Sequence, residues 1–239
     1  MGCMKSLLLA IFVALLMVGC GEADLSDPDV LEDVTDDAVD LSKLQDRGRI
    51  MYLPNEDTPF TGRAESFYEN GQKKREENYK DGKEDGLSTG WYENGQKYKE
   101  GNWKDGELQG LWTEWYENGQ KEREGKWKDG KQDGLLTDWF ENGQKMQEEN
   151  YKNGKSDGLL TNWWKNGQKF EEGNFKDGKM HGVWTQWYES GQKMSEKNYE
   201  NGELHGLWTE WHEDGTEIER LTYKDGEVVE DYPPDTPNP

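Results

Sequence analysis

The stretch WYENGQKEREGKWKDGKQDG, residues 115–134, contains two turn dipeptides, Asn118-Gly119 and Asp129-Gly130, eleven residues apart. Asn-Gly and Asp-Gly favour two-residue type I′ turns, because both central residues of such a turn need a positive φ. The residues between the two turns suffice for one strand. The stretch therefore predicts two hairpin turns, and hence two strands, within one short segment.

Both turns recur along most of the chain with a spacing of 24 residues. The first turn begins at Asn70, Asn94, Asn118, Asn142, Asn166, Ser190 and Asp214, and the second at Asp81, Asp105, Asp129, Asn153, Asp177, Asn201 and Asp225. A further glycine column runs through Gly62, Gly86, Gly110, Gly134, Gly158, Gly182 and Gly206. Seven repeats of two strands predict an all-β fold: one elongated antiparallel meander of β-hairpin repeats, about fourteen strands over residues 60–230.

Three aromatic columns follow the same period. They are Phe67, Trp91, Trp115, Trp139, Trp163, Trp187 and Trp211; then Tyr68, Tyr92, Tyr116, Phe140, Trp164, Tyr188 and His212; and, on the other strand, Tyr79, Trp103, Trp127, Tyr151, Phe175, Tyr199 and Tyr223. Neighbouring residues of a strand point to opposite faces. The Trp115 and Tyr116 columns are therefore expected on opposite faces of the sheet.

A two-residue turn at Asn118-Gly119 fixes the expected register. It places Trp115 opposite Glu122 and Thr113 opposite Glu124, and the next turn places Gly125 opposite Gly134. The Trp column then faces the position that carries Met146, Phe170 and Met194. These apolar neighbours predict that the Trp column is the better buried one.

The Tyr column has polar neighbours. Two residues before it, on the same face, the sequence has Glu114, Asp138, Asn162 and Gln186. Aromatic rings among polar side chains are typical of protein interfaces. We therefore expect a partner-binding groove along this column. Its residues would be Tyr92, Tyr116, Phe140, Trp164 and Tyr188. The alternative is that these rings merely cover neighbouring glycines and stabilise the sheet.

The N-terminus has the pattern of an export signal. Lys5 precedes an apolar run over residues 7–18, too short to span a membrane and typical of a signal-peptide core. The run ends in Gly19-Cys20, which resembles a bacterial lipoprotein box. We expect a signal peptide over residues 1–19 and a lipid on Cys20, so that the chain is anchored to the bacterial cell envelope, at the outer membrane or the periplasmic face. N-myristoylation at Gly2 and a plain secretory signal are the alternatives.

Two further segments flank the repeats. Residues 20–59 carry 12 acidic and 3 basic residues and predict an extended, flexible acidic tether. Residues 231–239 are rich in proline and predict a disordered tail. The only two cysteines, Cys3 and Cys20, lie at the N-terminus, so the repeats contain no disulfide.

The segment EGKWKDGK, residues 124–131, with Gly134 and the later Asn142-Gly143, resembles the MORN repeat, specifically its bacterial variant. Residues 100–103 and 172–175 match equally well. Bacterial proteins built from this variant are similar to those of the YwqK-type antitoxin family. The resemblance implies an elongated antiparallel sheet with a groove for partners. Two features depart from it: an export signal does not suit a cytoplasmic antitoxin, and the glycine of the motif is replaced in four repeats, by Glu77, Glu149, Lys197 and Leu221.

Catalytic and metal-binding patterns do not stand out. His181 and His205 share one column a repeat apart, about 9.6 Å, and cannot hold one zinc ion between them. The carboxylates recur as columns, whereas a catalytic pair should break the repeat symmetry. We expect a non-enzymatic protein without cofactor or metal.

Charge restricts the partners. The repeat region has a net charge of −12 and the whole chain −22, which disfavours nucleic acid and anionic headgroups. The sequence therefore favours a membrane-anchored scaffold that binds another protein. A second hypothesis is an antitoxin or immunity-type protein that neutralises a basic toxin, because an acidic face speeds such an encounter. A third is a cell-wall or glycan-binding module.

Overall fold

The computed structural model describes residues 38–232, all within one compact unit, Asp37–Pro239. The predicted signal peptide, Cys20, the first part of the tether and most of the tail lie outside the described residues. No helix in the described part of the chain has the length and hydropathy needed to cross a membrane.

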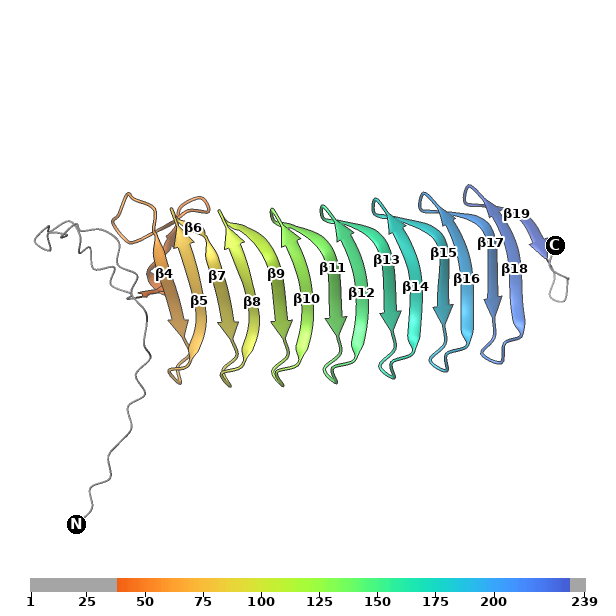
Figure 1. The fold of residues 1–239 in the computed structure, drawn as a ribbon, viewed down its shortest axis with the longest axis horizontal. Coiled ribbons are helices and arrows are strands. Elements are labelled where there is room, and N and C mark those ends of the chain that lie inside the picture. The colour runs from red at the N-terminus through yellow and green to blue at the C-terminus, as the bar shows by residue number, and fades with distance from the viewer. Residues whose placement is uncertain (1–37, 233–239) are drawn as a thin grey trace, which may run out of the picture. The chain divides into compact units, whose positions relative to one another are not determined.

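The repeats form one long sheet in which each strand pairs with its sequence neighbours (Figure 1). This confirms the predicted antiparallel meander. The sheet holds 17 strands because a short strand joins its N-terminal end, one strand is interrupted at Asp85 and a further strand follows the last predicted hairpin. Its strands are β1 Val39–Asp40, β4 Gly62–Phe67, β5 Lys73–Lys80, β6 Lys83–Glu84, β7 Gly86–Trp91, β8 Lys97–Lys104, β9 Glu107–Trp115, β10 Lys121–Lys128, β11 Lys131–Trp139, β12 Lys145–Lys152, β13 Lys155–Trp163, β14 Lys169–Lys176, β15 Lys179–Trp187, β16 Lys193–Glu200, β17 Glu203–Trp211, β18 Glu217–Lys224 and β19 Glu227–Tyr232.

The Asp-Gly turns have the predicted geometry. Asp129 and Gly130 have φ values of 49° and 69°, and Lys128 pairs directly with Lys131. This is a two-residue type I′ turn. The Gly130 amide also donates to the carbonyl of Leu108 in the preceding repeat, 3.2 Å away, so the turn ties neighbouring hairpins together.

The Asn-Gly turns differ from the prediction. Gly119 has a φ of 82°, but Asn118 is not left-handed. The Gly119 amide donates to the carbonyl of Tyr116, and the Tyr116 amide donates to that of Gln120. The Asn118 side chain accepts from the Gln120 amide at 2.9 Å, which holds the turn in place without a positive φ at the asparagine. The loop is therefore longer, with a glycine bulge on its far side.

This longer loop changes the register beside it. Trp115 pairs with Lys121 instead of Glu122, although Thr113 pairs with Glu124 as predicted. Glu122 is skipped at the bulge and moves to the face of Tyr116. The expected contact between the Trp column and Met146, Phe170 and Met194 was therefore wrong.

The predicted pair of Gly125 and Gly134 was also wrong. Gly125 pairs with Leu136, and a register shift separates this pair from that of Trp127 and Gln132. Gly134 lies in the shifted segment with a φ of 124°. The glycine column thus supplies a bulge, because few other residues adopt this conformation.

Residues 38–59 do not form an extended tether, which corrects the predicted boundary. They hold β1, a 3-10 helix (η2 Leu41–Lys43), and a two-stranded sheet of β2 Gln45–Asp46 and β3 Met51–Tyr52. Their apolar side chains pack against a hydrophobic core cluster formed by Phe60, Ala64 and Tyr79. The packed side chains are Val39, Leu41, Leu44, Met51 and Leu53. This N-terminal cap covers the first hairpin, as terminal caps of repeat arrays do.

At the other end of the sheet, no segment within residues 38–232 covers the edge strand. β19 continues to Tyr232, two residues beyond the predicted end of the repeats, and pairs only with β18. Its Glu227, Glu230 and Asp231 are exposed, and like charges on an edge strand oppose pairing with another chain.

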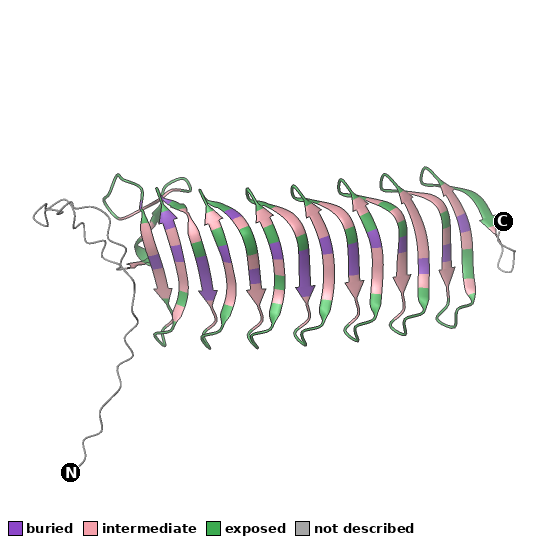
Figure 2. Ribbon diagram, viewed as in Figure 1, coloured by how far each residue is buried: buried purple, intermediate pink, exposed green. Residues whose placement is uncertain are grey.

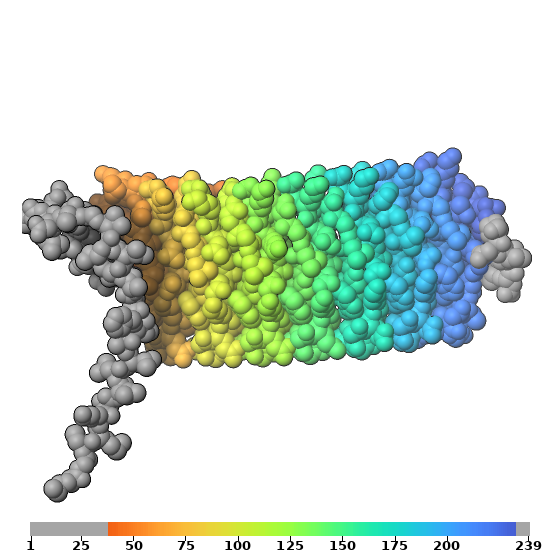
Figure 3. Space-filling view, in the orientation of Figure 1, coloured from red at the N-terminus to blue at the C-terminus, as the bar shows by residue number. Residues whose placement is uncertain are grey.

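Buried residues lie mostly in the middle of the strands (Figure 2). They include large apolar side chains such as Leu136 and polar residues such as Thr113 and Thr137, so the buried layer of the sheet is thin and partly polar. Successive repeats follow one another in sequence order along the surface (Figure 3). Stability must therefore come from contacts between neighbouring hairpins.

Candidate interaction face

One face of the sheet, here called the ladder face, repeats almost unchanged. It contains the columns of Thr113, Trp115, Lys121 and Glu124. Each column keeps its residue type in six of the seven repeats. The exceptions lie in the first and last repeats, where Glu65, Phe67, Glu217 and Arg220 replace them.

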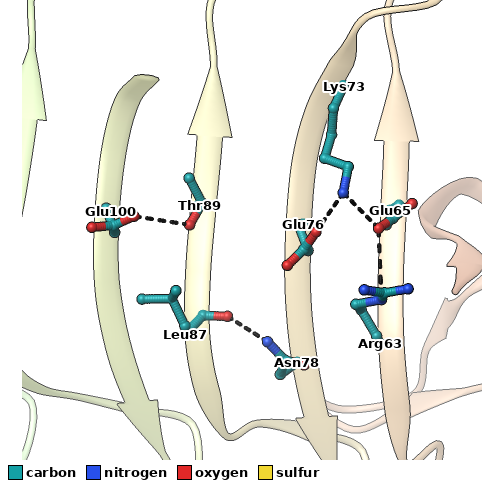
Figure 4. Close-up of polar contacts among 8 residues, drawn as sticks. All are labelled: Arg63, Glu65, Lys73, Glu76, Asn78, Leu87, Thr89 and Glu100. Carbon is teal, nitrogen blue, oxygen red and sulfur yellow. Dashed lines mark hydrogen bonds and ion pairs between the residues drawn. The ribbon is translucent and has the colours of Figure 1, made fainter. Parts of the chain in front are cut away.

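The ladder face is held by contacts among these columns. Lys121 forms an ion pair with Glu124, and the Thr113 hydroxyl donates to the Glu124 carboxylate at 3.4 Å. The Lys121 Nζ also lies 5.7 Å from the ring centre of Trp139. Figure 4 shows the first two hairpins, where Lys73 contacts Glu65 at 2.7 Å and Glu76 at 2.5 Å. In the last repeat the signs are exchanged, and Glu217 pairs with Arg220. The two substitutions at Glu217 and Arg220 together therefore preserve the ion pair.

The opposite face, here called the variable face, contains the columns of Trp112, Glu114, Tyr116, Glu122, Arg123, Gly125 and Trp127. Its residue types change from repeat to repeat. The Arg123 column reads Arg75, Lys99, Arg123, Gln147, Glu171, Ser195 and Glu219, and the Glu122 column reads Lys74, Tyr98, Glu122, Met146, Phe170, Met194 and Ile218.

The predicted Tyr column lies on the variable face, and its five rings are partly buried. The residues at the bulge, in the Glu122 column, pack beside this Tyr column. The ring centres of Tyr92 and Tyr98 are 5.5 Å apart, and those of Trp164 and Phe170 are 4.6 Å apart. The apolar side chains that were expected beside the Trp column thus lie beside the Tyr column and enlarge its apolar surface.

The sequence did not reveal that these rings also join the repeats. The Tyr116 hydroxyl donates to the carbonyl of Trp139, in the next repeat, at 2.6 Å. Tyr92 and Tyr188 make the same bond at 2.7 and 2.9 Å, and the Trp164 indole makes it at 3.1 Å. Phe140 has no donor. Burial, aided by the charge of Glu122, raises the pKa of Tyr92 and Tyr116.

The four replacements of the motif glycine have a physical explanation in two repeats. Glu149 is buried and accepts from the Tyr151 hydroxyl at 2.7 Å and from Gln147 at 2.9 Å. Glu77 accepts from Tyr79 at 2.6 Å in the same way. Where the glycine is kept, an indole can occupy the space: a Cβ on Gly173 would lie 2.1 Å from Trp184.

The variable face contains a hollow of 530 Å³ over the third repeat, from Trp103 in the second repeat to Leu136 in the fourth. Three indoles, two leucines and three charged groups contribute to its walls, which include Trp103, Leu108, Trp112, Glu114, Arg123, Trp127 and Leu136. Arg123 donates to Asp138 from Nε at 2.7 Å and from Nη2 at 3.3 Å. The hydrogen bond with Asp138 raises the pKa of Arg123.

Metal ligation was tested against the same geometry. Within residues 38–232 no group of three or more His, Cys, Asp or Glu side chains could hold a metal ion. His205 instead lies near Glu200 and Asp225, at 3.7 and 3.5 Å.

Comparison with protein families gives the origin of the repeats. The family described as "MORN repeat variant" matches seven consecutive segments, residues 60–81, 84–105, 108–129, 132–153, 156–177, 180–201 and 204–225. No curated protein matches the chain. The matched segments make up more than half of the sequence, and each spans most of one hairpin unit. The chain therefore belongs to the MORN repeat variant family.

Proposed function

We propose that the chain is a non-enzymatic scaffold that binds a protein partner along the variable face. We further propose that it is exported and held at the bacterial cell envelope by a lipid on Cys20. The observation that supports the scaffold proposal is the contrast between the two faces. The ladder face repeats what every hairpin needs, whereas the variable face carries a different surface in each repeat.

A repeat array needs no such variety for its own folding, since each hairpin meets the same neighbour contacts. Side chains that differ between repeats give the surface a direction and a distinct sequence of aromatic, acidic and basic groups. Such a surface suits one partner in one register. Interfaces of this kind combine aromatic anchors with a polar surround.

The column of Tyr92, Tyr116, Phe140, Trp164 and Tyr188 remains our proposed line of contact. The hydroxyls of the tyrosines are engaged between repeats, so the partner would meet ring faces and edges. Phe140 and, in the next repeat, Trp164 with Phe170 packed against it offer the most apolar part of this line.

Site-specific photocrosslinking tests the proposal. A photoreactive side chain replaces Glu122 on the variable face or, as the matched control, Leu111 on the ladder face, which is 48% exposed. After irradiation of intact cells, we expect the Glu122 position to yield one dominant protein adduct and the Leu111 position to yield none. Equal adducts from both positions, or none from either, would refute the assignment of the face.

The proposed anchor is tested separately. A fatty-acid probe should label the wild-type chain and not the Cys20→Ser variant, which should leave the membrane fraction. Equal labelling of both chains would exclude Cys20 as the lipid site.

The acidic repeats support a second candidate, a neutraliser of a basic toxin. Their net charge of −12 would speed association with a cationic protein. A glycan-binding role gains less support, because on the ladder face lysines lie over the rings of Trp91, Trp139, Trp163, Trp187 and Trp211. For the neutraliser, the crosslinked partner would be basic and its affinity would fall steeply with added salt.

A further inference from the structure

The hollow over the third repeat breaks the repeat symmetry. It lies where two consecutive repeats both have glycine followed two residues later by tryptophan, at Gly101-Asn102-Trp103 and Gly125-Lys126-Trp127. Elsewhere in the array the pattern is interrupted by Glu77, Glu149, Lys197 or Leu221, or the indole is replaced, as by Phe175. The space and the rings around it are thus specific to this place.

The walls of the hollow are mainly aromatic. The rings of Trp103 and Trp112 are perpendicular, with centroids 6.4 Å apart, and Trp127 contributes a third indole. Indole faces attract cations within about 6 Å, more strongly than other aromatic rings do. The chain already uses Trp112 in this way, because the Lys99 ammonium lies 5.8 Å from its ring centre. Lys99 is not part of the hollow's lining.

The charges around the hollow also favour a cation. Glu107 and Glu114 contribute to the walls, and neither forms an ion pair within residues 38–232. The one cationic wall residue, Arg123, is paired with the buried carboxylate of Asp138. Glu114 has two cationic register partners, Lys99 outside the hollow and Arg123 in its wall, and both offset part of its charge. The charge within the walls is still acidic.

We propose that this hollow binds a quaternary ammonium group. A primary ammonium is strongly hydrated and needs three acceptors, which three indoles and two leucines do not provide. A trimethylammonium group donates no hydrogen bonds and presents methyl groups to the rings while its charge faces Glu114. Trp103, in the wall, also has a buried indole N–H without a hydrogen-bond partner in the described part of the chain. This inference does not depend on the proposed protein partner.

Titration calorimetry with choline tests the site, and 3,3-dimethylbutanol is its neutral control of the same shape. We expect saturable binding of choline, with a shift of the Trp103 indole N–H signal in NMR spectra. The neutral alcohol should bind about tenfold more weakly, a difference of about 1.4 kcal/mol. Equal binding of the two ligands, or no saturable binding of choline, would overturn the proposal.

Variants locate the site. Glu114→Gln and Trp127→Leu should each weaken choline binding about fivefold, whereas Glu210→Gln, at the equivalent position of the last repeat, should leave it unchanged. Unchanged melting of Glu114→Gln would show that the loss is local. Phosphorylcholine, tested in parallel, identifies the source: tighter binding than choline points to a phosphate-linked headgroup and weaker binding to free choline. Wild-type affinity in both hollow variants would refute this location.

Discussion

The Tyr116 hydroxyl donates a hydrogen bond of 2.6 Å to the carbonyl of Trp139, one repeat further along the sheet. The bond links the end of one hairpin to the backbone of the next. Phe140 occupies the same position one repeat later and makes no such bond. The repeat with Tyr116 and the repeat with Phe140 therefore differ in this hydrogen bond, and variants at the two positions measure its strength.

Tyr116→Phe should lower the free energy of unfolding by about 1 kcal/mol, because a partly buried hydrogen bond contributes about this much. Phe140→Tyr should raise it by a similar amount, since the new hydroxyl can reach the carbonyl of Trp163. Urea unfolding measures both. Two unchanged midpoints would show that the bond does not join the repeats. The same bond means that Tyr116→Ala should also cost stability.

The ion pairs of the ladder face should tolerate a change of sign. Lys121→Glu and Glu124→Lys should each destabilise the protein, because each places like charges side by side. The double variant should recover most of the loss, since Glu217 and Arg220 show the exchanged pair in the last repeat. For these partly exposed pairs we expect a coupling of about 0.5 kcal/mol. A double-mutant cycle at low and high salt measures it; additive losses would contradict the pairing.

Stability should fall in alkaline solution through Tyr151. Burial and the hydrogen bond to Glu149 raise the pKa of Tyr151 to about 12, whereas an unfolded tyrosine has a pKa of about 10. Between these values the folded state holds the proton that the unfolded state has released, so stability is complete below pH 10 and decreases as the pH rises toward 12. Tyr151→Phe should flatten the decrease over this range. An identical pH profile for both proteins would refute the assignment.

The N-terminal cap, residues 38–59, should contribute to thermal stability although its acidic composition is typical of a flexible tether. A chain beginning at residue 38 should melt like one that begins at residue 21. A chain beginning at residue 60 should melt earlier and associate, because Ala64 and Tyr79 lose the apolar side chains that cover them. Light scattering and thermal melting measure both effects. Equal melting of the chains that begin at residues 38 and 60 would mean that the cap adds nothing.

Some features were predictable because they depend on local chemistry. The Asp129-Gly130 turn follows from two residues that accept a positive φ, and its recurrence predicts the meander. The Asn118 turn was not predictable in this way, since its side chain bonds the Gln120 amide and replaces the positive φ. That single difference moves Glu122, and with it Phe170, to the other face. The five predicted residues of the candidate groove lie on one face as expected, but the structure places the residues of the Glu122 column beside them.

The cap and the hollow depend on contacts distant in sequence. The acidic composition of residues 20–59 concealed Val39, Leu41 and Leu53, whose role requires the exposed face of the first hairpin. The hollow requires Trp112 beside both Gly101 and Gly125, and the predicted register had paired Gly125 with Gly134. The replacement of glycine by Glu77 and Glu149, each two residues before a tyrosine, was the one sequence signal for the coupling found there.

Deletion of one whole repeat tests most directly the claim that this protein is a linear array held by neighbour contacts. Removal of residues 156–179 joins hairpins whose ladder columns, turn bonds and tyrosine bonds recur with the same 24-residue spacing. Removal of residues 156–167 takes away one strand and reverses the order of the faces beyond it. Circular dichroism and melting compare the two proteins. We predict that the first folds and unfolds cooperatively as a shorter sheet and that the second is largely unfolded; equal loss of structure in both would contradict the account.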